Sequence, residues 1–181
     1  LDNQFMSRAL KNGAIIFHDY RLNPVLYSLG VTMIAITLHL LAALIWVGGM
    51  FFAYIAMRPA SQFLEPAMQL TLWSNTFKHF FPWVWLSIIS ILVSGFWLIA
   101  VSGGMGDVGS HVHVMLLLGI IMILMFMHVF FAPYKKLTHS VESKDWETGT
   151  RALAQIRFLI FINLSIGLFV TFIGSAGQYY L

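Results

Sequence analysis

Cysteine is absent from this chain. A disulfide framework, a thiolate metal site and an iron–sulfur cluster held by cysteines are therefore excluded. Charged residues are also scarce, because they make up 9% of the 181 residues, against about 25% in an ordinary soluble domain. Since 59% of the residues are hydrophobic, the composition indicates an integral membrane protein. Any metal ion or cofactor must be held by histidine, methionine or oxygen ligands.

Aspartate and glutamate are missing from the long apolar runs of the sequence. Their absence argues against a proton-coupled transporter that works through buried acids. The sequence also lacks a glycine-rich phosphate loop and a serine nucleophile elbow, so no catalytic motif of the soluble kind is present. The net charge of +3 is small, and we expect no nucleic-acid partner.

Four apolar runs reach about the 20 residues that a helix needs to cross a hydrocarbon core of about 30 Å. They are residues 29–57, 80–101, 112–132 and 158–176. The sequence therefore predicts an all-α integral membrane protein, an up-down bundle of four transmembrane helices. We expect residues 1–28 to form a short N-terminal interfacial segment ahead of a four-helix domain over residues 29–181. The short turn 102–110 predicts that the second and third helices are antiparallel neighbours.

Lysine and arginine are distributed unevenly between the two sides of this predicted bundle. Seven of them lie in the segments 58–79 and 133–157, and three lie ahead of the first helix. The positive-inside rule therefore predicts a multi-pass protein of the bacterial inner membrane, with both termini in the periplasm. The lipid bilayer is then the first partner of the chain.

One face of the first helix combines a histidine with a tryptophan and small residues. His39, Ala42, Trp46 and Gly49 follow one another at spacings of three or four residues, so they return near the same azimuth of a helix. Small residues beside large ones leave room for a flat cofactor or for a neighbouring helix. An ionisable group inside a span is a functional candidate. The alternative is a structural role, in which His39 forms a hydrogen bond to another helix.

Two pairs of histidines are expected at matched depths in the bilayer. At about 1.5 Å per residue, His39 and His113 fall near the outer boundary. His79 and His128 fall near the inner one. Two imidazoles at one depth on different helices are the ligands that a b-type haem requires, and two stacked sites would carry electrons across the membrane. The sequence therefore indicates one haem b, or two. The residues expected to line the cofactor are Trp46, Gly49 and Ala42.

A second set of candidate ligands surrounds the predicted outer turn. It consists of Met105, His111, His113 and Met115. Thioether and imidazole ligands together suit copper, and Cu(I) in particular. Methionine is also a common filler of apolar helices, so a copper site and plain packing stay open as alternatives. Copper is thus the alternative to haem.

The run His39-x6-Trp46-Val47-Gly48-Gly49-Met50-Phe51-Phe52, followed by Arg58-Pro59, resembles the first helix of the copper resistance protein D (CopD) family of bacterial inner-membrane proteins. The resemblance continues through His113, Arg157, Asn163, Leu164 and Gly167. It implies a membrane protein that handles copper or haem, with His39 and His113 as its main site residues.

The CopD family also resembles the HemJ-type protoporphyrinogen oxidases, which are four-helix proteins that bind haem b. Their helix-one histidine matches His39 and is a haem ligand there. This chain departs from them at two lysine positions, where it has Ile36 and Met115. We therefore do not expect protoporphyrinogen oxidase activity, and whether the chain is an enzyme at all stays open.

Three functions follow from these patterns. The first, which we favour at this point, is a b-type haem protein that transfers electrons, with a quinone or a periplasmic redox protein as its partner. The second is a copper-binding or copper-transport protein, which would work with a periplasmic copper protein. The third is an accessory subunit of a larger membrane complex. Self-association of the chain stays open as well.

Overall fold

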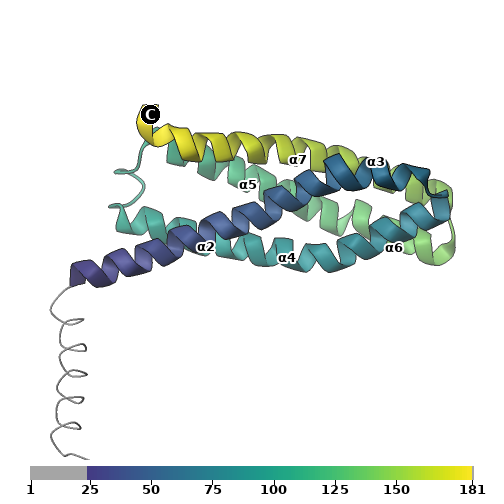
Figure 1. Cartoon of the computed structure of the whole chain (residues 1–181), viewed down its shortest axis with the longest axis horizontal. Coiled ribbons are helices and arrows are strands. Elements are labelled where there is room, and N and C mark those ends of the chain that lie inside the picture. Colours follow the sequence, from purple (N-terminus) through teal and green to yellow (C-terminus); the bar gives the residue numbers. More distant parts are fainter. Residues whose placement is uncertain (1–23, 181) are drawn as a thin grey trace, which may run out of the picture.

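The computed structural model describes residues 24–180, so the first 23 residues of the predicted interfacial segment lie outside the described part. Within that part, four helices are long and apolar enough to cross a membrane. Figure 1 shows them lying side by side along one direction. The chain is thus an all-α membrane protein built as a four-helix bundle, which confirms the prediction from the apolar runs.

The helices follow one another with only short breaks. They are α2 (Pro24–Phe52), the π-helix η1 (Ala53–Met57), α3 (Arg58–Ala60), the 3-10 helix η2 (Ser61–Phe63), α4 (Pro66–Val101), α5 (Ser110–Phe131), α6 (Pro133–Ser143) and α7 (Trp146–Tyr180). Prolines stand at the first turn of α3, α4 and α6, where the missing N–H costs no hydrogen bond. Because α2 begins at Pro24, residues 24–28 already belong to the first long helix.

The short elements gather at the two ends of the bundle (Figure 1), and the ends differ in composition. One end carries α3, η2 and α6, and we call it the basic end. The lysines and arginines of the described residues lie in or beside these elements, and they are Arg58, Lys78, Lys135, Lys136, Lys144, Arg151 and Arg157. The other end carries the turn 102–109 and the last turns of α7, and we call it the glycine end. Gly103 and Gly104 there have φ values of +99°, which glycine adopts without strain.

Two of the helices extend well past the predicted spans at the basic end. The sequence predicts loops over 58–79 and 133–157, whereas α4 already begins at Pro66 and α7 at Trp146. Hydropathy alone misses these turns because their exposed faces are polar. Their other faces are apolar at helical spacing, as in Leu70, Trp73 and Phe77, which are all buried. At 36 residues, α4 is about 54 Å long and exceeds a hydrocarbon core of about 30 Å.

The second and third helices are antiparallel neighbours, as predicted, but they meet through large side chains, such as the rings of Phe81 and Phe126, whose centres lie 5.4 Å apart. α4 and α5 run antiparallel, but their backbones make almost no contact, whereas α2 packs on α4 and α5 packs on α7. The reason lies in the glycines, which allow backbones to approach closely. Gly49 and Gly95 lie at the contact of α2 with α4, and Gly167, Gly174 and Gly177 lie at the contact of α7 with its neighbours. Nearer the basic end, the rings of Trp85 and Phe126 fill the space between α4 and α5, whereas near the glycine end that space holds a cavity.

Candidate metal-binding cavity

A cavity of about 290 Å³ lies in the half of the bundle near the glycine end. Its walls come from all four long helices, and most of them are apolar. The wall residues that can bind a metal ion or form a hydrogen bond through a side chain are His39 and Trp46 on α2, Ser102 after α4, Met115 and Met122 on α5, and Thr171 on α7. The cavity thus has mostly apolar walls, into which one imidazole and two thioether side chains are set.

The imidazole of His39 is held by a serine on the neighbouring helix. Its Nδ1 atom lies 2.9 Å from Oγ of Ser94. The hydroxyl of Ser94 has a single hydrogen, which it donates to the carbonyl oxygen of Ser90 at 2.5 Å. With that hydrogen directed to Ser90, Oγ of Ser94 can accept from Nδ1–H of His39, and this tautomer leaves the lone pair of Nε2 free. A neutral imidazole oriented in this way is the form that binds metal ions.

Gly95 brings α4 close to the same imidazole. A β-carbon added at Gly95 would lie 3.3 Å from Cε1 of His39, so a larger residue there would press on the ring. Ser94 and Gly95 therefore act together on His39, the first by hydrogen bonding and the second by leaving space.

The two methionines face glycines of α7. A β-carbon added at Gly174 would lie 2.9 Å from Cε of Met115, and one added at Gly167 would lie 3.1 Å from Cε of Met122. His111 packs on Gly177 in the same way, because a β-carbon added at Gly177 would lie 2.7 Å from the Cβ atom of His111. His111, Met115 and Met122 lie within about 40° of one another around α5, since each residue turns a helix by about 100°. They form a row of imidazole and thioether side chains along one face of α5, which we call the α5 ladder.

A second, much smaller void of about 30 Å³ lies next along the bundle. Trp46 lines both spaces, so its indole ring lies between them. Met50 and Met125 line the small void together with Asn163. The Asn163 amide donates to the carbonyl oxygen of Met122 at 3.4 Å, while its Oδ1 is buried with no partner in the described structure. The void is large enough for one water molecule.

The residues predicted to line a cofactor on α2 have different surroundings. Trp46 lines the cavity. Ala42 is buried, but Ala43 is the alanine in the cavity wall. Gly49 lies outside the wall, and a β-carbon there would overlap the ring of Phe80 on α4. Gly49 thus serves the close approach of α2 and α4.

The structure does not bring the predicted histidine pairs into one site. His113 is exposed, and it is turned about 100° from Val112, which lies in the cavity wall. Its Nδ1 lies 3.3 Å from the carbonyl oxygen of Gly109. His79 and His128 are exposed as well, and Nδ1 of His79 lies 2.8 Å from the carbonyl oxygen of Asn75. His113 therefore does not share the cavity with His39, and the predicted inner pair is exposed at both of its members.

The predicted copper ligands separate into two groups. Met115 lines the cavity, and His111 lies one turn above it on the α5 ladder, with its Nδ1 buried and without a partner. Met105, in contrast, is 41% exposed in the turn, and His113 lies on the other side of α5. Among the described residues, no three His, Cys, Asp or Glu side chains come close enough to hold a metal ion.

Two further site residues, Ser94 and Met122, are not among the sequence predictions. No sequence motif singles out Ser94, because it reaches His39 only through the packing of α4 on α2. Met122 has a detectable signal, because it follows Met115 by seven residues, or two helical turns. Its spacing places both thioethers on one face of α5.

These features define the class of protein. It is a multi-pass membrane protein whose four-helix bundle contains an apolar cavity lined in part by imidazole and thioether side chains. The chain belongs to the copper resistance protein D family, whose model matches residues 74–176, more than half of the chain. The predicted family is thereby confirmed, and the protein is related to copper resistance. The match begins within α4 and does not include His39. No curated protein and no solved structure matched the chain.

Proposed function

We propose that the protein binds Cu(I) in the membrane and passes it along the bundle axis. The observation that carries this proposal is the cavity that His39, Met115 and Met122 line together. Thioether and imidazole ligands select Cu(I) over harder ions. The absence of histidine and carboxylate clusters from the described residues supports the same choice, because Zn²⁺ and Mg²⁺ would need such ligands.

The spacing of the soft ligands supports passage as well as binding. Along the α5 ladder, Met115 lies about 6 Å below His111, and Met122 lies about 10 Å below Met115. Met50 and Met125 continue the series at the small void beyond Trp46. Ions pass through a protein when each site is favourable enough to be occupied and weak enough to be left. A series of neutral thioether sites has this property, since no single site carries a negative charge.

The distribution of basic residues supports a direction for the path. Lysines and arginines gather at the basic end, and the positive-inside rule assigns that end to the cytoplasm. The glycine end, where the cavity lies, would then face the periplasm of a bacterial inner membrane. His111 is the ladder residue nearest that side, so copper would reach it first.

Measurement of bound copper in matched methionine variants tests the proposal. The protein is loaded with Cu(I) under reducing conditions, freed of excess metal and analysed for copper. We expect the double variant Met115→Leu, Met122→Leu to lose most of its copper and Met127→Leu to keep it. Met127 lies on the same helix, but it is 36% exposed and outside both cavities. Equal copper content in the double variant and the control contradicts the proposal.

Passage is tested separately with proteoliposomes. Silver(I) serves as the probe, since it resembles Cu(I) in its preference for sulfur and does not change oxidation state. We expect the wild-type protein to carry Ag(I) into the vesicles and the double methionine variant to lose this activity. Binding without passage would reduce the proposal to a copper-binding protein.

A b-type haem protein is the second candidate, and the volume of the cavity favours it. About 290 Å³ is more than a copper ion needs, and the wall is apolar. The predicted ligation by two histidines does not fit, because His39 is the one histidine in the wall of the described cavity. A reduced-minus-oxidised absorption spectrum of the purified protein decides the matter. The absence of a Soret shift and of an α band removes haem from consideration.

A further inference from the structure

Arg157 lies half-buried at the basic end, away from the cavity. Its Nη2 donates to Oγ of Ser61 at 3.3 Å, and its guanidinium carbon lies 4.9 Å from the centre of the Trp73 ring. Its Nε is buried and has no hydrogen-bond partner among the described residues. The guanidinium group is therefore oriented by its neighbours, but only part of its hydrogen-bonding capacity is used.

A second arginine lies beside it. Oγ of Ser61 donates to the carbonyl oxygen of Arg58 at 3.0 Å, so one serine contacts both arginines. The Arg58 guanidinium lies 4.9 Å from the centre of the Tyr54 ring. The charges of Arg58 and Arg157 are close enough to repel each other. Two cations thus face the same region, each resting on an aromatic ring.

In the described part of the chain, no carboxylate forms an ion pair with either arginine. Within residues 24–180, the structure contains one ion pair, between Arg151 and Glu147 near the start of α7. Two partly buried cations without a counter-ion carry a desolvation cost that aromatic rings and one serine offset only in part. An anion between them would remove the repulsion and use the free N–H groups.

The depth of the pair indicates which anion is available. Arg58 follows the apolar run 29–57 directly, and Arg157 precedes the apolar run 158–176 directly. Both arginines therefore lie at the boundary of the hydrocarbon region, which is where the phosphates of lipid headgroups lie. The planar guanidinium group offers paired donors that match a phosphate.

We propose that Arg58 and Arg157 bind the phosphate group of an anionic phospholipid at the basic end of the bundle. Ser61 orients the guanidinium of Arg157 for this ligand, and the rings of Trp73 and Tyr54 lie against the two guanidinium groups. The site is separate from the copper path, because none of these residues lines either cavity. Its role is to hold α7 at Arg157 and the short helix α3 at Arg58 on one lipid molecule.

Thermal unfolding of the full-length protein in a neutral detergent tests the site. Phosphatidylglycerol, phosphatidylcholine or inorganic phosphate is added, and the midpoint of unfolding is followed by tryptophan fluorescence. We expect phosphatidylglycerol to raise the midpoint by several degrees and the other two to leave it nearly unchanged. An equal rise with inorganic phosphate shows that a free anion is the ligand and overturns the lipid proposal. An equal rise with phosphatidylcholine shows that the arginines do not select an anionic headgroup and overturns it as well.

Matched arginine variants assign the effect to residues. We expect Arg157→Gln and Arg58→Gln each to weaken the phosphatidylglycerol effect about tenfold in lipid concentration. Arg151→Gln removes the same charge from an exposed position and should respond like the wild type. Arg157→Lys keeps the charge without the paired donors, so its response to phosphatidylglycerol should lie between those of Arg157→Gln and the wild type. If Arg157→Gln does not fold, Arg58→Gln carries the comparison. An undiminished response in Arg58→Gln overturns the proposal.

Discussion

The Nδ1 atom of His39 on α2 lies 2.9 Å from the hydroxyl of Ser94 on α4. With the hydroxyl hydrogen directed to Ser90, the serine favours the imidazole tautomer that carries its proton on Nδ1. Nε2 is left as the nitrogen with a free lone pair. The position of α4 against α2 thus prepares His39 as a ligand, and the family match covers the helix that supplies the serine.

Replacement of Ser94 by alanine should weaken copper binding without unfolding the protein. The imidazole would lose its orienting partner, and such losses typically lower metal affinity about 10- to 100-fold. Affinity is measured by competition with a chromogenic Cu(I) chelator. Ser165→Ala is the control, because Ser165 is exposed and bonds only to the carbonyl oxygen of Phe161 in its own helix. An unchanged affinity in Ser94→Ala would show that the hydrogen bond has no part in binding.

The neighbouring glycines 48 and 49 should respond in opposite ways to alanine. A β-carbon at Gly49 would overlap the Phe80 ring, whereas one at Gly48 meets no atom within 4 Å. We expect Gly49→Ala to lower the free energy of unfolding by about 1–3 kcal/mol, as overpacking does. Gly48→Ala should be neutral or raise it by about 0.5–1 kcal/mol, because alanine favours the helix. Thermal unfolding in detergent measures both. Similar midpoints for the two variants would contradict the packing of α2 on α4.

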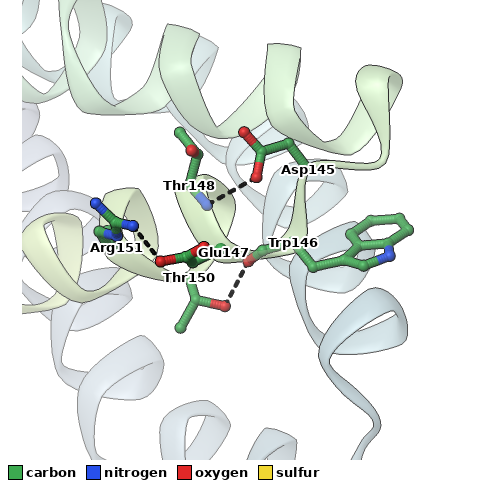
Figure 2. Close-up of polar contacts among 6 residues, drawn as sticks. All are labelled: Asp145, Trp146, Glu147, Thr148, Thr150 and Arg151. Carbon is green, nitrogen blue, oxygen red and sulfur yellow. Dashed lines mark hydrogen bonds and ion pairs between the residues drawn. The ribbon is translucent and has the colours of Figure 1, made fainter.

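The start of α7 should contribute a pH-dependent part of the stability. Figure 2 shows Asp145 capping the helix, with its carboxylate accepting the backbone N–H of Thr148 at 3.1 Å. Hydrogen bonds from the Thr148 side chain and backbone lower the pKa of Asp145 below its ordinary value. A lowered pKa means that the ionised form stabilises the folded state. This contribution is complete above the ordinary pKa and is lost as the pH falls through the lowered one.

Asp145→Asn tests this contribution, because asparagine caps a helix about as well but does not ionise. The midpoint of unfolding is measured for both proteins from neutral pH into the acid range. We expect the advantage of the wild type to shrink as the pH falls, by a small amount because Asp145 is exposed. Glu142→Gln is the control for the loss of one negative charge near the same helix end. Parallel curves for wild type and Asp145→Asn would show that the cap does not titrate.

Residues whose role depends on one helix alone are predictable from the sequence. The four spans follow from hydropathy. His39 and Trp46 follow from their spacing on one helix face, and both line the cavity. The extra turns of α4 and α7 are less visible, because their polar faces lower the mean hydropathy although residues such as Leu70 and Ile156 are fully buried. A helical periodicity over 66–79 is the signal that indicates them.

Relationships between helices are harder to predict. The depth of His113 is easily counted, but its azimuth relative to α2 depends on which helices pack together. The pairing of α2 with α4 and of α5 with α7 follows from where glycines meet large side chains, such as Gly174 with Met115. A single sequence does not say which partner each glycine faces. For the same reason, neither Ser94 nor the Arg58 and Arg157 pair is predictable as a site.

X-ray absorption spectroscopy of the Cu(I)-loaded protein tests the central claim most directly, because it reports the atoms bound to copper. We predict a first shell that contains thioether sulfur together with imidazole nitrogen. The nitrogen contribution should disappear in His39→Gln and the sulfur contribution in the double variant Met115→Leu, Met122→Leu. A shell of nitrogen and oxygen atoms without sulfur, or a sulfur contribution that persists in the double variant, would contradict the account.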